Sequence, residues 1–269
     1  MLRRYVPNVL REVAGEATLF SKIAPSLEAA ERWVADELTG DAVIDRIAEE
    51  AEQDRQWQTV AGVVACKAMA ECVPMLDLVL TPNGFGVVNN SNVAPASRER
   101  VDRLVAALRS RWQCLAARLL DDLRSDQLWH QSHQFTRWST LLVSPLDLSR
   151  LAGDGTMPLT DYDQRHAEQA GYEQAIAREF VGEEYMASLR YSWWTDTVGV
   201  DDLRIVNDVM NAVALSLKQG KPRMEALVAT VDMIRRYPSA YPLWHTSPIA
   251  ELYSHEPFKN KKENHGYFL

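Results

Sequence analysis

Two histidines, His130 and His133, have the spacing of a metal-binding pair. Side chains three positions apart lie on one face of an α-helix, and imidazole nitrogens are common ligands of transition metals. A metal centre needs more than two ligands and supporting hydrogen bonds, and no third ligand is identifiable nearby in the sequence. We therefore expect a surface or interface pair. A helical metal-dependent enzyme that uses His130 and His133 is kept as an alternative.

Other signatures of catalysis are incomplete. Gly84-Phe85-Gly86 has two glycines of a phosphate-binding loop, but the full glycine spacing and a preceding βαβ unit are missing. No nucleophile elbow occurs, and paired acids such as Glu49-Glu50 are chain neighbours, which point to different parts of a helix surface. We predict no catalytic residues, no metal and no cofactor, hence a protein that is not an enzyme.

The length of 269 residues, the composition and the net charge of -8 are those of an ordinary globular protein. This charge argues against a general nucleic-acid binder, although a local basic surface can exist on an acidic protein. The three cysteines lack C-x-x-C spacing, so we predict reduced thiols and no disulfide. No apolar stretch approaches the length of a membrane span, and we expect an intracellular protein without membrane contact.

The longest predicted helix starts after Ser97 and has about 25 residues. Its apolar residues recur at steps of three and four: Val101, Leu104, Val105, Leu108, Trp112, Leu115, Leu119 and Leu123. Four arginines, Arg100, Arg103, Arg111 and Arg118, fall in one narrow sector beside this stripe. We interpret this arginine ridge either as a solvated flank or as a surface that faces a DNA channel or an acidic partner.

A turn-rich segment precedes that helix. Pro82-Asn83-Gly84 favours a turn, and Phe85, Val87 and Val88 are typical of strands. We predict a protruding β-hairpin or extended loop near residues 81–95, with these three apolar side chains binding a partner or another copy.

The fold class predicted from periodicity is mainly α: a helical bundle with this hairpin, a second helical region and an extended C-terminal tail. The predicted domains are 1–145, 158–238 and a tail over 239–269. Turn formers between Ser144 and Pro158 indicate a linker or long surface loop. No internal repeat is evident.

Individual helices are marked by caps and breakers. In the first region, one helix is expected after Ser26 and before Gly40, a second opens at Asp41, and a third begins near Asp54 and is interrupted at Pro74. In the second region, helices are expected over 161–181, 183–194, from Asp201 or Asp202 to Gly220, and from Pro222 to Tyr237.

The tail combines charge and aromatic character. Lys259, Lys261 and Lys262 lie among the aromatic residues Phe258, Tyr267 and Phe268. A tail that only improves solubility is typically poor in aromatics, so we predict that it docks on its own fold or on a neighbour. A frayed end is the alternative.

Three segments carry a resemblance to a known group of proteins: V-P-M-L-D-L-V-L-T-P-N-G-F-G-V-V-N-N-S-N-V-A-P-A-S-R-E-R-V, I-R-R-Y-P-S-A-Y-P-L-W-H-T-S and F-K-N-K-K-E-N-H-G-Y-F-L. With them the chain resembles, from about residue 15, proteins of unknown function encoded by phages and prophages of gut Bacteroidales, crAss-like phages included. The first segment is the specific one. The resemblance brings no catalytic residues.

This resemblance implies a structural role in the virion. The predicted architecture is also similar to that of phage head-tail adaptors, whose helices and hairpin form rings under the portal. The expected partners are further copies in a cyclic homo-oligomer, a dodecamer if it matches a portal, then the portal and other neck or tail proteins, with non-specific contact to packaged DNA. The expected location is the phage neck, after synthesis in the host cytoplasm. A regulatory nucleic-acid-binding protein is a further alternative.

Overall fold

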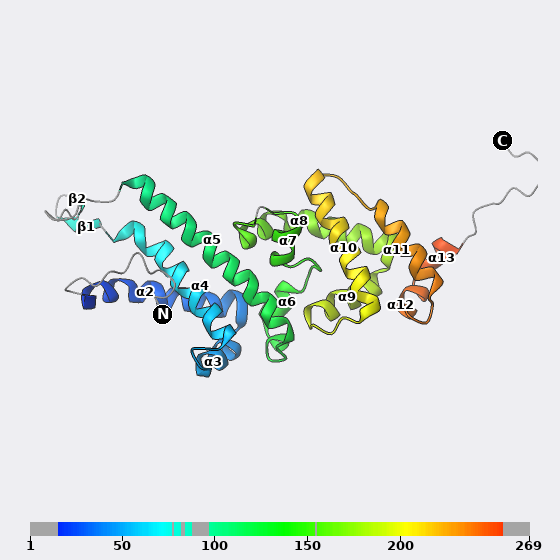
Figure 1. The fold of residues 1–269 in the computed structure, drawn as a ribbon, viewed down its shortest axis with the longest axis horizontal. Coiled ribbons are helices and arrows are strands. Elements are labelled where there is room, and N and C mark those ends of the chain that lie inside the picture. The colour runs from blue at the N-terminus through cyan, green and yellow to red at the C-terminus, as the bar shows by residue number, and fades with distance from the viewer. Residues whose placement is uncertain (1–15, 77, 82–83, 88–96, 154, 255–269) are drawn as a thin grey trace, which may run out of the picture.

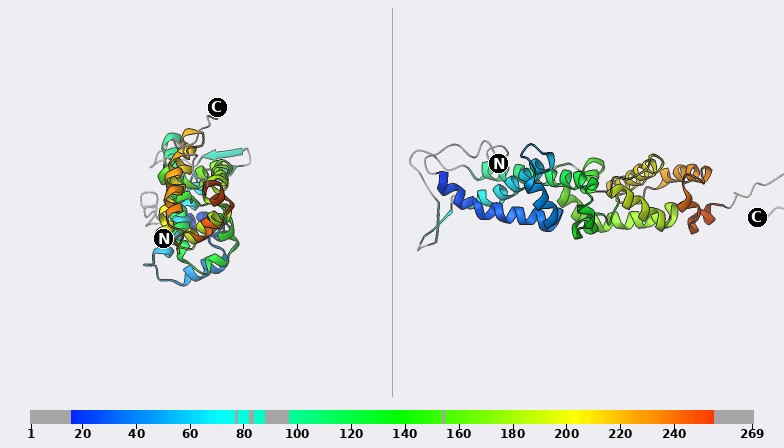
Figure 2. Two further views of the ribbon diagram at one scale, coloured as in Figure 1. Left: turned by 90° about the vertical axis from the view of Figure 1, so that its right-hand side faces the viewer. Right: turned by 90° about the horizontal axis from the view of Figure 1, so that it is seen from below.

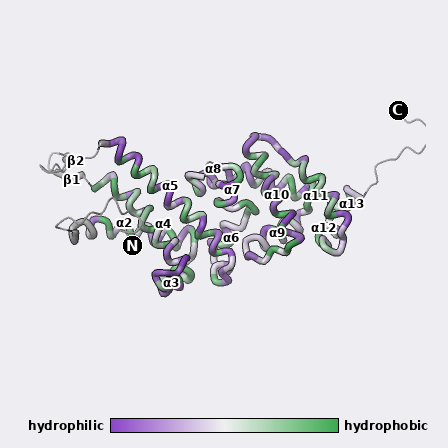
Figure 3. The backbone as a smooth tube through the Cα atoms, in the orientation of Figure 1, coloured by the Kyte–Doolittle hydropathy of each residue, from purple (hydrophilic) through white to green (hydrophobic). Residues whose placement is uncertain are grey.

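The computed structural model describes residues 16–76, 78–81, 84–87, 97–153 and 155–254. The protein is mainly helical and elongated, with the first half of the chain at one end of the long axis and the second half at the other (Figures 1 and 2). Hydrophobic and hydrophilic residues alternate along the helices, as amphipathic packing requires (Figure 3). Among the described helices, none combines the length and the apolar character needed to cross a bilayer.

The first half is built on four helices: α2 (Glu16–Val34), α3 (Asp41–Glu49), α4 (Arg55–Cys72) and α5 (Arg98–Asp122). The side chain of Asp54 accepts hydrogen bonds from two backbone N–H groups and caps α4, as predicted. The helix ends at Cys72, where Pro74 lies in a short 3-10 turn. The bounds of α5 are confirmed, although the Ser97 side chain makes no capping hydrogen bond.

The start of α2 was predicted wrongly. Ser26 does not cap a helix, because α2 begins at Glu16 and continues through Pro25. The helix then passes into a π-helical turn over Ala35–Thr39 and ends at Gly40, whose φ of 80° suits glycine alone. The predicted end at Gly40 and start at Asp41 are therefore confirmed.

Two short strands lie between α4 and α5. β1 (Leu78–Thr81) pairs antiparallel with β2 (Gly84–Val87), with Leu78 opposite Val87. This pairing begins before the predicted 81–95 segment, and residues 82–83 and 88–96 lie outside the described residues. A protruding hairpin that reaches a partner stays a prediction.

The segment after α5 packs against the π-helical turn over Ala35–Thr39. It contains a 3-10 turn at Trp129–Gln131 and the short helix α6 (His133–Trp138). The linker predicted between Ser144 and Pro158 is wrong over its first part, because residues Pro145–Leu151 form helix α7 and its first four residues are buried. The described residues between α7 and α8 are not helical, as predicted. Ser144 and Asp147 make a reciprocal capping box, and Pro145 at the first position fits a helix start.

The second half repeats this kind of architecture. It contains α8 (Pro158–Ile176), a π-helical turn over Ala177–Val181, α9 (Glu183–Trp194), α10 (Val200–Gln219) and α11 (Glu225–Arg236). The predicted breaks at Gly182 and Gly220 and the bounds of α9 are confirmed. The helix expected from Pro222 begins later, at Glu225.

The tail is not extended over its first part. Residues Pro242–His245 form α12 and Pro248–Ser254 form α13. Trp244 is buried, and its indole N–H donates to the carbonyl of Phe180 at 2.8 Å, which fixes these helices to the second half. Each helix has a proline at its first position, where the missing N–H has no cost. Residues 255–269 lie outside the described residues.

The two halves are two copies of one structural unit. α2 and α8 both have 19 residues, both run into a five-residue π-helical turn, and both end at a glycine of positive φ. A-D-E-L-T-G-D at 35–41 corresponds to A-R-E-F-V-G-E at 177–183, and L-W-H-Q-S at 128–132 to L-W-H-T-S at 243–247. The order α2, α3, α4, α5, α6 thus matches α8, α9, α10, α11, α13.

The shared motifs make the same contacts in both copies. The Trp129 indole donates to the carbonyl of Leu38 at 2.8 Å, as Trp244 does to Phe180, the position that corresponds to Leu38. A Cβ placed at Gly40 would lie 3.4 Å from Ser132 Cβ, and one at Gly182 would lie 3.1 Å from Ser247 Cβ. A duplication explains this agreement better than chance, because residues distant in sequence contact each other in the same pairs.

A continuous hydrophobic core joins the two copies. It includes residues from Ala30 to Ile249, and α5 packs against both α7 and α8. A smaller cluster between α2, α4 and α5 contains Cys66 and Cys72, which are free buried thiols. Burial raises the pKa of both thiols, so they stay protonated.

Candidate interaction surfaces

The second copy contains a buried carboxylate, Glu173, that holds a segment arriving from the first copy. Glu173 lies on α8 and has no exposed surface. The backbone N–H of Leu142 donates to its two oxygens at 2.8 and 3.0 Å, and the N–H of Val143 donates at 3.3 Å. Residues 141–143, which we call the strap, therefore complete the core of the second copy.

Further hydrogen bonds fix the strap. The Gln169 amide donates to the carbonyl of Val143 at 2.9 Å, and the Trp194 indole donates to that of Leu141 at 2.7 Å. The strap residues are buried together with the facing parts of α8, α9 and α10. The N–H groups of Leu142 and Val143 and the carbonyls of Leu141 and Val143 are thus satisfied by side chains of the second copy, as burial of polar groups requires.

Arg190 on α9 supplies the balancing charge. Its Nε donates to Glu173 at 3.1 Å. Burial raises the pKa of Glu173 above its ordinary value of 4.5, while the strap N–H groups and Arg190 oppose that rise. An ion pair of this kind is costly to break because the remaining partners lose their hydrogen bonds.

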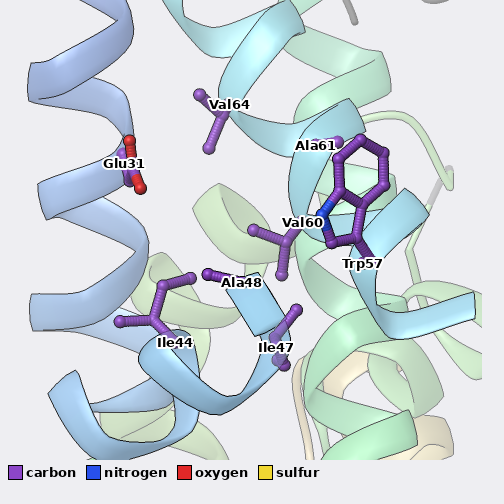
Figure 4. A pocket seen from close by; sticks show the side chains of 8 residues that line it. All are labelled: Glu31, Ile44, Ile47, Ala48, Trp57, Val60, Ala61 and Val64. Atoms are coloured by element: carbon purple, nitrogen blue, oxygen red, sulfur yellow. The ribbon is translucent and has the colours of Figure 1, made fainter. Parts of the chain in front are cut away.

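The corresponding place in the first copy is an open groove. Glu31 occupies the position of Glu173, since both lie four residues before the alanine that begins the π-helical turn. The groove lies between α2, α3 and α4 (Figure 4). Its lining residues are Glu31, Ile44, Ile47, Ala48, Trp57, Val60, Ala61 and Val64.

The groove differs from its filled counterpart in two respects. Glu31 is exposed, whereas Glu173 is fully buried, and among the described residues no strap covers Glu31. Ala48 stands where the second copy has Arg190, so the balancing charge is missing. The groove floor is apolar, and its acidic side chain projects from α2 at the rim (Figure 4).

Other acidic side chains lie near Glu31 at the rim of the groove. A shallow depression that shares Glu31 and Ile44 with the groove also carries Glu28, Asp41 and Asp45, with Arg32 as a single basic residue. Four carboxylates against one guanidinium give a local charge that favours a basic ligand.

The arginine ridge of α5 is solvent-facing. Arg100, Arg103, Arg111 and Arg118 are all exposed. Arg103 pairs with Glu99 at 3.5 Å, which weakens the ridge at its start. The four side chains share one face, as the spacing predicts, and their role stays a prediction.

The other predicted partner residues are only partly placed. Phe85 and Val87 lie in β2. Val88, Phe258, Tyr267 and Phe268 lie outside the described residues.

The histidine pair does not lie on one helix. His130 belongs to a 3-10 turn and His133 begins α6, with Ser132 in extended conformation between them. The His130 ring contacts the carbonyl of Arg124 at 2.9 Å through Nε2. Within the described residues, no group of three or more metal-ligating side chains is present.

Sequence reasoning missed the pair Glu31 and Glu173. A glutamate four residues before an A-x-E-[LF]-x-G motif was the available signal, and it becomes visible once the two copies are aligned. Trp57 and Ile44 also line the open groove.

Comparison with known proteins adds one finding. Residues 10–138, which span the first copy, match a family of unknown function, DUF6712. No curated protein and no solved structure gives a significant match. The match ends at Trp138, the last residue of α6 and thus the boundary of the first copy.

Proposed function

We propose that this protein is a structural component of a phage neck, a head-tail connector that forms a closed ring beneath the portal. The observation that carries the proposal is the unequal state of two equivalent grooves: one is filled within the chain and the other is open. A unit that is completed by a segment from its predecessor is suited to joining further units head to tail.

The phage context comes from the sequence resemblance of residues 73–101, 234–247 and 258–269. The matched family supplies no activity. An elongated helical body with a short strand pair at one end also suits a subunit that reaches its neighbours in a ring. The partners are then other copies, the portal and further neck proteins, and the location is the virion.

In such a ring the arginine ridge faces the DNA channel or an acidic surface of the portal. Four exposed guanidinium groups on one helix face provide sequence-independent attraction to phosphates or carboxylates. Reversing Arg100, Arg111 and Arg118 to glutamate is expected to reduce genome retention or portal binding without changing the helix content. Unchanged retention and binding would remove this role of the ridge.

The proposed function is tested by light scattering and electron microscopy of the purified protein, alone and with the portal protein encoded beside it. Rings, alone or on the portal, are the expected result. A monodisperse monomer that ignores the portal at all concentrations would contradict the connector role. Metal analysis of the same sample checks the enzyme alternative, since a connector is expected to contain no stoichiometric metal.

A further inference from the structure

We propose that residues 255–269 of a second copy of this chain fill the open groove of the first copy's unit, as the strap fills the groove of the second unit. This inference deepens the proposed ring, because it names the segment and the groove that join neighbouring subunits. It rests on the duplication, on the position of the tail in the sequence and on charge.

The position of the tail follows from the duplication. The strap begins three residues after the end of α6, and residues 255–269 follow α13, the helix that corresponds to α6. Counted from Ser132 and Ser247, Val143 corresponds to Phe258. Each unit is therefore followed by a segment with an apolar residue at the place where the strap contacts Glu173.

The chemistry of the groove matches that of an inserted backbone. Glu173 accepts two strap N–H groups, and Glu31 offers the same carboxylate at the same position. Leu142 corresponds to Pro257, which has no N–H, so Phe258 is the donor expected in this register. The Phe258 ring then occupies the apolar floor between Ile44, Val60 and Val64 (Figure 4).

Charge also favours the tail over an unrelated peptide. Lys259, Lys261 and Lys262 follow Phe258 directly. The groove rim carries Glu28, Asp41 and Asp45 beside Glu31. Arg190, which balances Glu173, has no counterpart in the groove because Ala48 takes its place, and a tail lysine supplies the missing charge.

The tail of the same chain does not reach this groove. Phe258 is four residues beyond Ser254, a span of at most about 14 Å of extended chain. α13 lies at the end of the molecule opposite the first copy, with the helices α8 to α11 between them (Figures 1 and 2). The occupant is therefore the tail of a neighbour, and the contact is heterologous, one surface meeting a different one.

The decisive experiment uses two single variants of the full chain. Glu31→Lys disables the groove and leaves the tail intact, and Phe258→Asp disables the tail and leaves the groove intact. Each alone is expected to lose the wild-type oligomer. Mixed in equal amounts they are expected to form a dimer of twice the 30.4 kDa chain mass. The one sound tail and the one sound groove of that pair are both used in its contact, and the groove and tail that remain are disabled, so assembly stops there.

The control is Glu52→Lys, which changes the same charge at an exposed position outside the groove and should assemble like the wild type. Circular dichroism checks that all variants keep their helix content. If both Glu31→Lys and Phe258→Asp assemble normally, the groove and tail contact is wrong, while the proposed ring stands on the wild-type micrographs.

A peptide assay covers the case in which rings form only on the portal. A labelled peptide of residues 255–269 is titrated with the full-length Phe258→Asp chain, and its fluorescence anisotropy is measured. Saturable binding is expected, and the same chain with Glu31→Lys should bind at least about tenfold more weakly. Absence of binding, or equal binding by both chains, would overturn the inference whatever the micrographs show.

Discussion

The first copy presents Glu31 at an open groove, whereas the second copy buries Glu173 beneath the strap. The two positions have the same residue type on equivalent helices, α2 and α8, so the difference comes from the segment that precedes each unit. The second unit has a predecessor in the same polypeptide, and the first has none among the described residues. The same structural unit thus occurs once with its groove filled by the strap and once with its groove open.

The largest expected difference is in stability. Glu173→Ala leaves the strap N–H groups and Arg190 without their acceptor and should lower the free energy of unfolding by about 3–5 kcal/mol. Glu31→Ala, the matched change, should cost less than about 0.5 kcal/mol because the side chain is exposed. Chemical denaturation of the two variants measures both values. Equal losses of unfolding free energy would contradict the assignment of a filled groove at Glu173 and an open groove at Glu31.

A second pair of changes should behave alike. Gly40→Ala and Gly182→Ala place a Cβ on a backbone with φ of 80° and 93° and against Ser132 and Ser247, respectively. Each is expected to cost about 2 kcal/mol. Gly171→Ala on α8 is the control: a Cβ there meets nothing within 4 Å, and it should stabilise by about 0.5–1 kcal/mol. Thermal unfolding of the three variants measures the order of their stabilities.

The paired tryptophans give a smaller effect. Trp129→Phe and Trp244→Phe remove the indole N–H that reaches the carbonyls of Leu38 and Phe180. The loss of one buried hydrogen bond should cost about 1–2 kcal/mol in each copy. A large cost at one site and none at the other would show that the two motifs are not equivalent.

The smallest expected effect is on pH dependence. Because burial raises the pKa of Glu173, the folded protein holds a proton there that the unfolded chain releases near pH 4.5. The stability of the wild type should therefore fall, relative to Glu173→Gln, as pH rises from about 4.5 through the folded-state pKa. Urea melts at several pH values test this, and a rise in relative stability would reverse the sign.

Local signals in the sequence were sufficient for many helix ends. Asp54, Pro74, Gly182 and Gly220 act through their own backbone geometry or a neighbouring N–H group, so the sequence alone predicts their effect. Ser144-Pro145 was misinterpreted as a turn, because serine followed by proline begins both turns and helices. The reciprocal hydrogen bonds between Ser144 and Asp147 stabilise a helix start here.

The groove and its counterpart were beyond such reasoning. Glu31 and Glu173 are two acidic residues on two amphipathic helices, and only tertiary packing buries one of them. The duplication was missed because the motifs are short and their spacing differs: Gly40 and Gly182 are 142 positions apart, but Trp129 and Trp244 are 115 apart. The second copy has a much shorter last long helix, α11, than α5.

The strap also sets an order of folding. Residues 141–143 leave the ribosome before α8, α9 and α10, the helices whose core they complete. The helices of the first unit pack against one another. The helices of the second unit also pack against the strap, which has been synthesised before they emerge. Synthesis from the N-terminus thus gives the second unit an attached nucleus for its core.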